Sequence, residues 1–314
     1  MKRCPITYDV IKEDESYSQR GLHLLSPTLL QLKQLEYSAA EQRSEAIARA
    51  GKMSIQGVQV KLSAQLKVKE GCFEFVDQRG HYILKPQSQF YPELPENEAI
   101  TMTLAASIGI DVPIHGLVYA KDGSMTYFIK RFDRYGHDNK LAVEDFAQLS
   151  QSTRDTKYNS SMEKVVKVIN DFCSFPKIEA MKLLRLTLFN YLIGNEDMHL
   201  KNFSLITREQ KILMSPAYDL LNTTIAQKNT KEELALPLNG KKNNIKSTDF
   251  LIYFAQHKLD LNKKVIADIL QDIEKALPTW KELIHHSFLS AEMKKKYLQL
   301  LNERTEKLFN TNIG

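Results

Sequence analysis

Three side chains in the second half of the chain have the types and the spacing that ATP-dependent phosphoryl transfer requires. Asp197 is followed five positions later by Asn202, and Asp219 lies 22 positions after Asp197. In this chemistry one carboxylate orients the hydroxyl nucleophile, while a carboxamide and a second carboxylate hold magnesium against the ATP phosphates. We therefore expect Asp197 to act on the nucleophile and Asn202 and Asp219 to bind Mg²⁺. A capped turn would use the same residue types, so the spacing alone leaves that alternative open.

Two other residues of the same segment are candidates for the site. Lys201 lies between Asp197 and Asn202, where its ammonium group could neutralise the γ-phosphate during transfer. His199 could contact the nucleotide, although we favour a hydrogen bond that fixes the loop to a backbone carbonyl. No second histidine occurs at the spacing of a metal site, which argues against His199 as a metal ligand.

A lysine and a glutamate nearer the N-terminus could complete an ATP site. Lys85 ends the apolar segment 81–85, which has the pattern of a strand, and Glu98 lies near the start of the helix expected next. A lysine that points into a cleft can pair with the α- and β-phosphates, and an ion pair with a glutamate would hold it in place. Each residue alone has an ordinary explanation, namely a solvated strand end and a favourable charge in a first helical turn.

The segment 54–61, Ser-Ile-Gln-Gly-Val-Gln-Val-Lys, precedes these strands and could cover the triphosphate with backbone N–H donors. It holds one glycine, so it matches neither the G-x-G-x-x-G pattern nor a Walker A loop. Taken by itself, the segment would be a turn that leads into a strand.

The periodicity of the chain predicts two regions of different secondary structure. Residues 51–132 have the alternation of strands, with one helix over 96–108, and helical spacing dominates after residue 133. We predict an α+β protein with a small β-rich lobe over 1–132, a larger all-α lobe over 133–314 and a cleft between them. The other helices are expected over 27–37, 39–50, 162–172, 178–193, 265–277 and 291–309.

Composition argues against several other classes of protein. The 314 residues are 43% hydrophobic and 26% charged, as in a globular protein with a substantial core. No apolar run of about 18 residues or more occurs, so we expect no membrane span. Three scattered cysteines form neither a metal spacing nor a disulfide framework, and the N-terminus lacks an apolar leader, so we predict a cytoplasmic protein. The net charge of +5 does not demand a nucleic-acid partner.

The candidate residues occur in the order and the context of one known family. Over residues 51 to about 310 the chain resembles the HipA family of bacterial serine/threonine toxin kinases. The matching segments are 54–61, 82–86, 96–98, 109–113, 130–134, 195–204 and 216–220. The resemblance implies a bilobal, protein-kinase-like fold with ATP and Mg²⁺ as cofactors.

The resemblance also implies a role for each candidate. Asp197 would be the catalytic residue with Lys201 beside it, and the segment 129–132 would be the hinge that contacts adenine. Asn202 and Asp219 would bind magnesium. The residues expected to contact the nucleotide are Gly57, Val58, Gln59, Lys61, Lys85, Glu98, Ile129, Lys130, Phe132 and His199.

Members of this family phosphorylate an aminoacyl-tRNA synthetase, which inhibits translation. They are usually bound by a DNA-binding antitoxin that represses their operon. By resemblance we expect a toxin kinase of a type II toxin–antitoxin system that phosphorylates a serine of such a synthetase and contacts operator DNA only indirectly. The family also autophosphorylates a serine in the phosphate-covering loop, and Ser54 occupies that position. A phosphate there would add about −1.5 to −2 charges beside the ATP phosphates, so we predict that it is inhibitory.

The region before the covering loop differs from that of the long members of the family. Those members carry a β-rich subdomain there, whereas about 50 residues precede Ser54 in this chain. The chain therefore resembles the short form, in which that module is a separately encoded small protein. We expect such a protein to dock on the β-rich lobe and to act as, or assist, the antitoxin.

Two other functions are compatible with parts of the pattern. Small-molecule kinases of the aminoglycoside or choline type also pair an Asp-x-x-x-x-Asn loop with a later aspartate. They usually have a histidine before the catalytic aspartate, where this chain has Glu196. A non-catalytic binding module with a degenerate kinase fold would not need the complete set of acidic-loop residues and Lys85.

Overall fold

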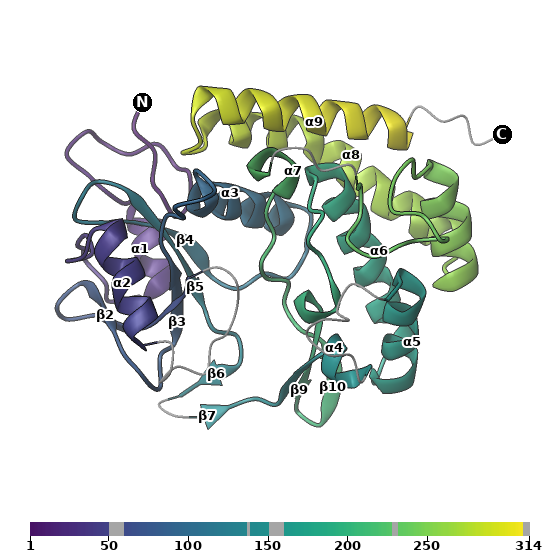
Figure 1. Cartoon of the computed structure of the whole chain (residues 1–314), viewed down its shortest axis with the longest axis horizontal. Coiled ribbons are helices and arrows are strands. Elements are labelled where there is room, and N and C mark those ends of the chain that lie inside the picture. The colour runs from purple at the N-terminus through teal and green to yellow at the C-terminus, as the bar shows by residue number, and fades with distance from the viewer. Residues whose placement is uncertain (50–59, 137–138, 151–159, 228–231, 310–314) are drawn as a thin grey trace. The chain divides into compact units, whose positions relative to one another are not determined.

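The computed structural model describes residues 1–49, 60–136, 139–150, 160–227 and 232–309 (Figure 1). The chain divides into two compact units. The first unit contains residues 1–100, 113–138 and 285–290, and the second contains residues 101–112, 139–284 and 291–314. The lobes expected over 1–132 and 133–314 stay a prediction.

The first unit is built on a five-stranded antiparallel sheet with the order β2-β1-β3-β5-β4. Two hairpins, β1–β2 and β4–β5, flank the central strand β3, which pairs with β1 on one side and β5 on the other. The strands are β1 (Leu62–Lys67), β2 (Cys72–Phe75), β3 (Tyr82–Lys85), β4 (His115–Tyr119) and β5 (Met125–Lys130), and β6 (Arg134–Tyr135) follows them. The helix α3 (Leu94–Ser107) follows β3 and begins in this unit.

The N-terminal segment packs on this sheet and contains two helices, α1 (Gln19–Leu25) and α2 (Ala39–Arg49). The prediction of a helix over 27–37 is wrong, because these residues are not helical. Their amides bond to distant parts of the unit: the Lys33 N–H donates to the Gly71 carbonyl at 2.7 Å and the Leu35 N–H to the Tyr119 carbonyl at 2.8 Å. Leu29, Leu32 and Leu35 of this irregular segment are buried in the core, whereas Leu30 is exposed.

The second unit is mainly helical. It contains α4 (Phe146–Leu149), α5 (Met162–Phe172), α6 (Pro176–Ile193), α7 (Thr223–Ala226), the π-helix η2 (Asp249–Lys258), most of α8 (Lys263–His286) and α9 (Ala291–Phe309). Helix α8 runs through Pro278, where the sequence predicted that it would end. The helix continues because the fully buried Trp280 packs on Phe189 of α6 at a ring distance of 5.4 Å, and burial outweighs local propensity.

A small antiparallel sheet, β10-β9-β8, lies in the same unit and adds to the lobe that we predicted to be all-α. Its strands are β8 (Val143–Asp145), β9 (Ser204–Arg208) and β10 (Lys211–Met214), and the short strand β7 (Asn139–Lys140) precedes them. Glu209 and Gln210 both have positive φ in the β9–β10 turn, a conformation that usually calls for Asn or Gly. The residues of this turn therefore did not indicate a hairpin in the sequence. With a sheet-based first unit and a helical second unit, the α+β class is confirmed.

Candidate active site

Gly194 turns the chain out of helix α6 and into residues 195–204, which we call the Asp197 segment. It caps the helix in the left-handed conformation, with φ of 72°, and its N–H bonds back to the last turn. A Cβ atom at this position would lie 2.4 Å from a Leu300 methyl and 2.7 Å from the Thr224 hydroxyl. Glycine is therefore required both by backbone conformation and by space.

Replacing Gly194 with alanine is expected to lower the free energy of unfolding by about 1–3 kcal/mol, because the turn before Asp197 must shift. Urea unfolding monitored by circular dichroism measures this effect. Gly123→Ala is the control, since Gly123 also has positive φ (79°) but a Cβ atom there would have nothing within 4 Å. A Gly194→Ala protein as stable as the Gly123→Ala protein would contradict the steric explanation.

Hydrogen bonds hold the backbone of Asp197 from both sides while its carboxylate stays accessible. The Asn195 Oδ1 atom accepts the Asp197 N–H at 3.1 Å, and the Asn202 Nδ2 atom donates to the Asp197 carbonyl at 2.8 Å. The Asp197 side chain is 44% exposed, with the His199 Nε2 atom 3.9 Å from its Oδ1. A fixed backbone with an accessible carboxylate is what a group that receives a substrate hydroxyl requires.

Asn202 and Asp219 both offer oxygen atoms to a cation. Asn202 ends the 3₁₀ turn η1 (Leu200–Asn202), and its Nδ2 bond to Asp197 fixes the amide so that Oδ1 is the end available for a ligand. Asp219 lies between β10 and α7 with φ of 54°. No three His, Cys, Asp or Glu side chains in the described ranges gather as a metal site. Magnesium commonly takes only one or two carboxylates and completes its shell with phosphates and water, so a carboxamide and a carboxylate are donors of the kind that it uses. That these two residues bind Mg²⁺ stays a prediction.

Glu196, the residue before Asp197, is anchored by the C-terminal half of the unit. Its N–H donates to the Thr223 hydroxyl at 2.7 Å, and its Oε1 atom accepts from the Thr224 hydroxyl at 2.7 Å. The guanidinium of Arg304 in α9 approaches the same Oε1 atom to 4.0 Å. Sequence reasoning did not find Arg304, because nothing in the local pattern of α9 distinguishes it from a surface arginine.

In the first unit, the ion pair predicted between Lys85 and Glu98 is present. The Lys85 Nζ atom lies 2.6 Å from the Glu98 Oε1 atom, and the two side chains are only 3% and 1% exposed. Lys85 lies opposite Tyr127 of β5 in the sheet, and its ammonium is 5.5 Å from the centre of that ring. The ion pair fixes the position of the ammonium group, and a contact of Lys85 with ATP phosphates stays a prediction.

Glu96 is a second buried carboxyl on the same turn of α3. Both of its oxygens accept from the Gln87 amide, at 2.7 and 2.9 Å. Burial raises the pKa of Glu96 to about 7, from an ordinary value of 4.5. Because the folded state favours the protonated form, its contribution to stability is complete below pH 4.5 and is lost as the pH rises through 7.

We therefore expect wild type to lose about 2–3 kcal/mol of unfolding free energy between about pH 5 and 8 relative to Glu96→Gln, which does not titrate. Urea unfolding at a series of pH values tests this. The exposed Glu306 in α9 supplies the control, and Glu306→Gln should keep the wild-type slope. Parallel curves for wild type and Glu96→Gln would show that Glu96 does not titrate in this range.

The predicted hinge residues lie at the end of β5. Ile129 is buried and pairs with Ile83 on one side and His115 on the other, while Lys130 and Phe132 are half-buried. Lys61 is half-buried just before β1. Nucleotide contacts by these residues stay predictions. Ser54, Gly57, Val58 and Gln59 lie outside the described residues.

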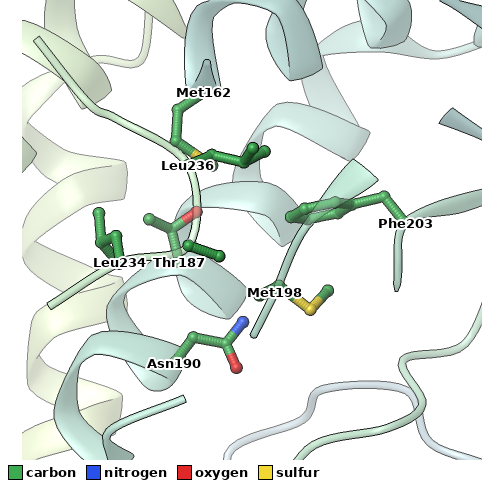
Figure 2. A pocket seen from close by; sticks show the side chains of 8 residues that line it. Met162, Thr187, Asn190, Met198, Phe203, Leu234 and Leu236 are labelled. Atoms are coloured by element: carbon green, nitrogen blue, oxygen red, sulfur yellow. The ribbon is translucent and has the colours of Figure 1, made fainter. Parts of the chain in front are cut away.

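A hollow of about 10 Å³, the size of one water molecule, lies beneath the Asp197 segment (Figure 2). Met198 and Phe203 of that segment face Met162 and Leu236 across it (Figure 2). The hollow is too small for a nucleotide. It is where the apolar side of the segment packs on the helical core, which leaves the polar side of the segment for chemistry.

Comparison with known proteins decides the family. The profile of the HipA-like C-terminal domain matches residues 53–280, well over half of the chain. The chain belongs to the HipA-like C-terminal domain family. In sequence it is 29% identical over 308 residues to an inferred kinase of Haemophilus influenzae, covering 88% of this chain and 89% of that protein. It is 27% identical over 209 residues to the serine/threonine-protein kinase toxin HipA of Shewanella oneidensis, covering 60% of this chain and 47% of that toxin.

Solved structures agree with the kinase-like fold expected for this family. HipA of Shewanella oneidensis, solved with HipB and operator DNA, matches with a TM-score of 0.70 at 22% identity, over 91% of this chain and 74% of that one. The proinflammatory kinase CtkA of Helicobacter pylori matches with a TM-score of 0.53 at 18% identity, over 73% of this chain and 88% of that one. The kinase relatives found by sequence imply ATP as the phosphoryl donor. No helix in the described ranges has both the length and the apolar character needed to cross a bilayer.

Proposed function

We propose that this chain is a serine/threonine protein kinase that transfers the γ-phosphoryl group of ATP to a serine of a protein target. The observation that carries the proposal is the Asp197 segment, whose backbone is fixed by Asn195 and Asn202 while its carboxylate stays accessible. The buried Lys85–Glu98 pair supports it from the first unit. Together these groups match the parts that phosphoryl transfer between ATP and a hydroxyl requires.

Each residue has a definite part in the proposed reaction. The serine oxygen of the target attacks the γ-phosphorus while the bond to the ADP oxygen breaks. Asp197 orients the attacking hydroxyl and accepts its proton, Lys201 balances the charge on the transferring group, and Lys85 holds the α- and β-phosphates. Asn202 and Asp219 would hold magnesium, which neutralises phosphate charge when it is bound.

We also propose the biological setting that the family resemblance implies. The target would be an aminoacyl-tRNA synthetase, so that its phosphorylation inhibits translation, and Ser54 would be an inhibitory autophosphorylation site. HipA of Shewanella oneidensis forms a complex with HipB and operator DNA. By analogy a DNA-binding antitoxin would hold this chain, and a separately encoded small protein would dock on the lobe formed by residues 1–132.

The test is to incubate the purified chain with ATP, Mg²⁺ and a dialysed lysate, and to compare phosphopeptides with those of a parallel Asp197→Asn reaction. We expect new phosphoserine peptides from one synthetase, together with a phosphate on the peptide that contains Ser54. Phosphate transfer to a small molecule without any protein acceptor would favour the aminoglycoside- or choline-kinase alternative. ATP left unconsumed by wild type under all metal conditions would refute the kinase proposal.

A further inference from the structure

The hydroxyl of Tyr218 joins two segments that are separate in the sequence. Its oxygen lies 2.9 Å from the Lys201 carbonyl and 2.6 Å from the Ser204 hydroxyl. A carbonyl can only accept, so the phenol proton points to Lys201 and the Ser204 hydroxyl donates to the phenol oxygen. One side chain thus binds η1 and the start of β9 at the same time.

The neighbours of these bonded groups are the two candidate magnesium ligands. Tyr218 directly precedes Asp219, and Lys201 directly precedes Asn202. Asp219 has φ of 54°, a left-handed conformation that is uncommon for residues other than glycine but that aspartate tolerates better than most. The bonds of the adjacent Tyr218 help to hold the backbone at this point.

We infer that the Tyr218 hydroxyl is a positioning group that fixes Asn202 and Asp219 relative to each other and so sets the metal affinity of the site. The inference rests on the proposed function, because it takes these two residues as the metal ligands. Tyr218 itself is a positioning residue, not a ligand, since its oxygen is already engaged by Lys201 and Ser204. Groups that orient metal ligands commonly change metal affinity about 10- to 100-fold when they are removed.

Tyr218→Phe removes the hydroxyl and keeps the ring, so the packing of the segment is retained. We expect about tenfold weaker binding of Mn²⁺, measured by electron paramagnetic resonance with a non-hydrolysable ATP analogue present. Binding of the analogue without metal should stay as in wild type. The half-saturating Mg²⁺ concentration for ATP turnover should rise by a similar factor.

Tyr297→Phe is the matched control. Tyr297 is fully buried and its hydroxyl bonds to the Thr101 hydroxyl at 2.8 Å, so this variant also loses a buried phenol bond, but from α9 to α3. Mn²⁺ affinity should not change in it. Equal weakening in both variants would overturn the inference, because the loss would then reflect general destabilisation.

A second variant keeps the inference testable if Tyr218→Phe does not fold. Ser204→Ala removes one of the two bonds and leaves the Tyr218–Lys201 bond in place, and we expect about two- to threefold weaker Mn²⁺ binding. If a folded Tyr218→Phe protein bound Mn²⁺ as tightly as wild type, the inference would be overturned while the proposed function stands. If Tyr218→Phe did not fold, the same result in Ser204→Ala would overturn it. Wild type that binds neither Mn²⁺ nor the nucleotide analogue would overturn both.

Discussion

Replacing Asp197 with asparagine is expected to lower the rate of phosphoryl transfer about 10³-fold while the fold and the affinity for nucleotide are retained. Asparagine keeps the size of the side chain but can neither accept a proton nor attract the target hydroxyl through a full charge. Because the side chain is 44% exposed and the backbone of the residue is held by Asn195 and Asn202, we expect the substitution to cost little stability. Release of ADP and transfer of radiolabelled phosphate measure the rate.

Asp171→Asn is the control for this experiment. Asp171 lies in α5 with its side chain 45% exposed and pairs with Lys167, so the same change is made at nearly the same exposure. Its rate should stay within about twofold of wild type, because the change lies outside the proposed machinery. An Asp197→Asn protein that transfers phosphate as fast as Asp171→Asn would show that Asp197 does not act on the nucleophile.

Lys85→Met is expected to cost about 3–5 kcal/mol of unfolding free energy, because it leaves the Glu98 carboxylate buried without its cation. The variant should also lose nucleotide binding, because Lys85 is the proposed partner of the α- and β-phosphates. Both side chains are almost fully buried, so water cannot replace the lost partner. Urea unfolding gives the stability, and calorimetric titration with an ATP analogue gives the affinity.

The double variant Lys85→Met/Glu98→Leu separates the two effects. Removing both charges should restore most of the stability, since an apolar pair of similar size avoids the desolvation cost, but nucleotide binding should stay lost. Lys296→Met is the surface control: Lys296 and Glu292 also lie 2.6 Å apart, with side chains 52% and 77% exposed, so we expect a change below about 1 kcal/mol. Nucleotide binding by the double variant would show that Lys85 serves the fold alone.

The predicted helices show how far local pattern reaches. The sequence predicted α5 and α9 with the bounds that the structure has, because each has apolar side chains at helical spacing. The same reasoning failed over 27–37, where leucines at similar spacing are buried without a helix. Periodicity reports which side chains are buried, but it cannot tell whether the backbone amides bond locally or to a distant strand.

For the candidate site, the sequence determined the inventory: Asp197, Asn202, Asp219, Lys85 and Glu98 are recognisable from type, spacing and family context. How these groups are held could not be read from the sequence and follows from the folded structure. The burial of the Lys85–Glu98 pair and the bonds of Tyr218 to Lys201 and Ser204 join elements through space. Spacing along the chain fixes which groups are present, whereas their orientation depends on long-range packing and hydrogen bonds that no local pattern encodes.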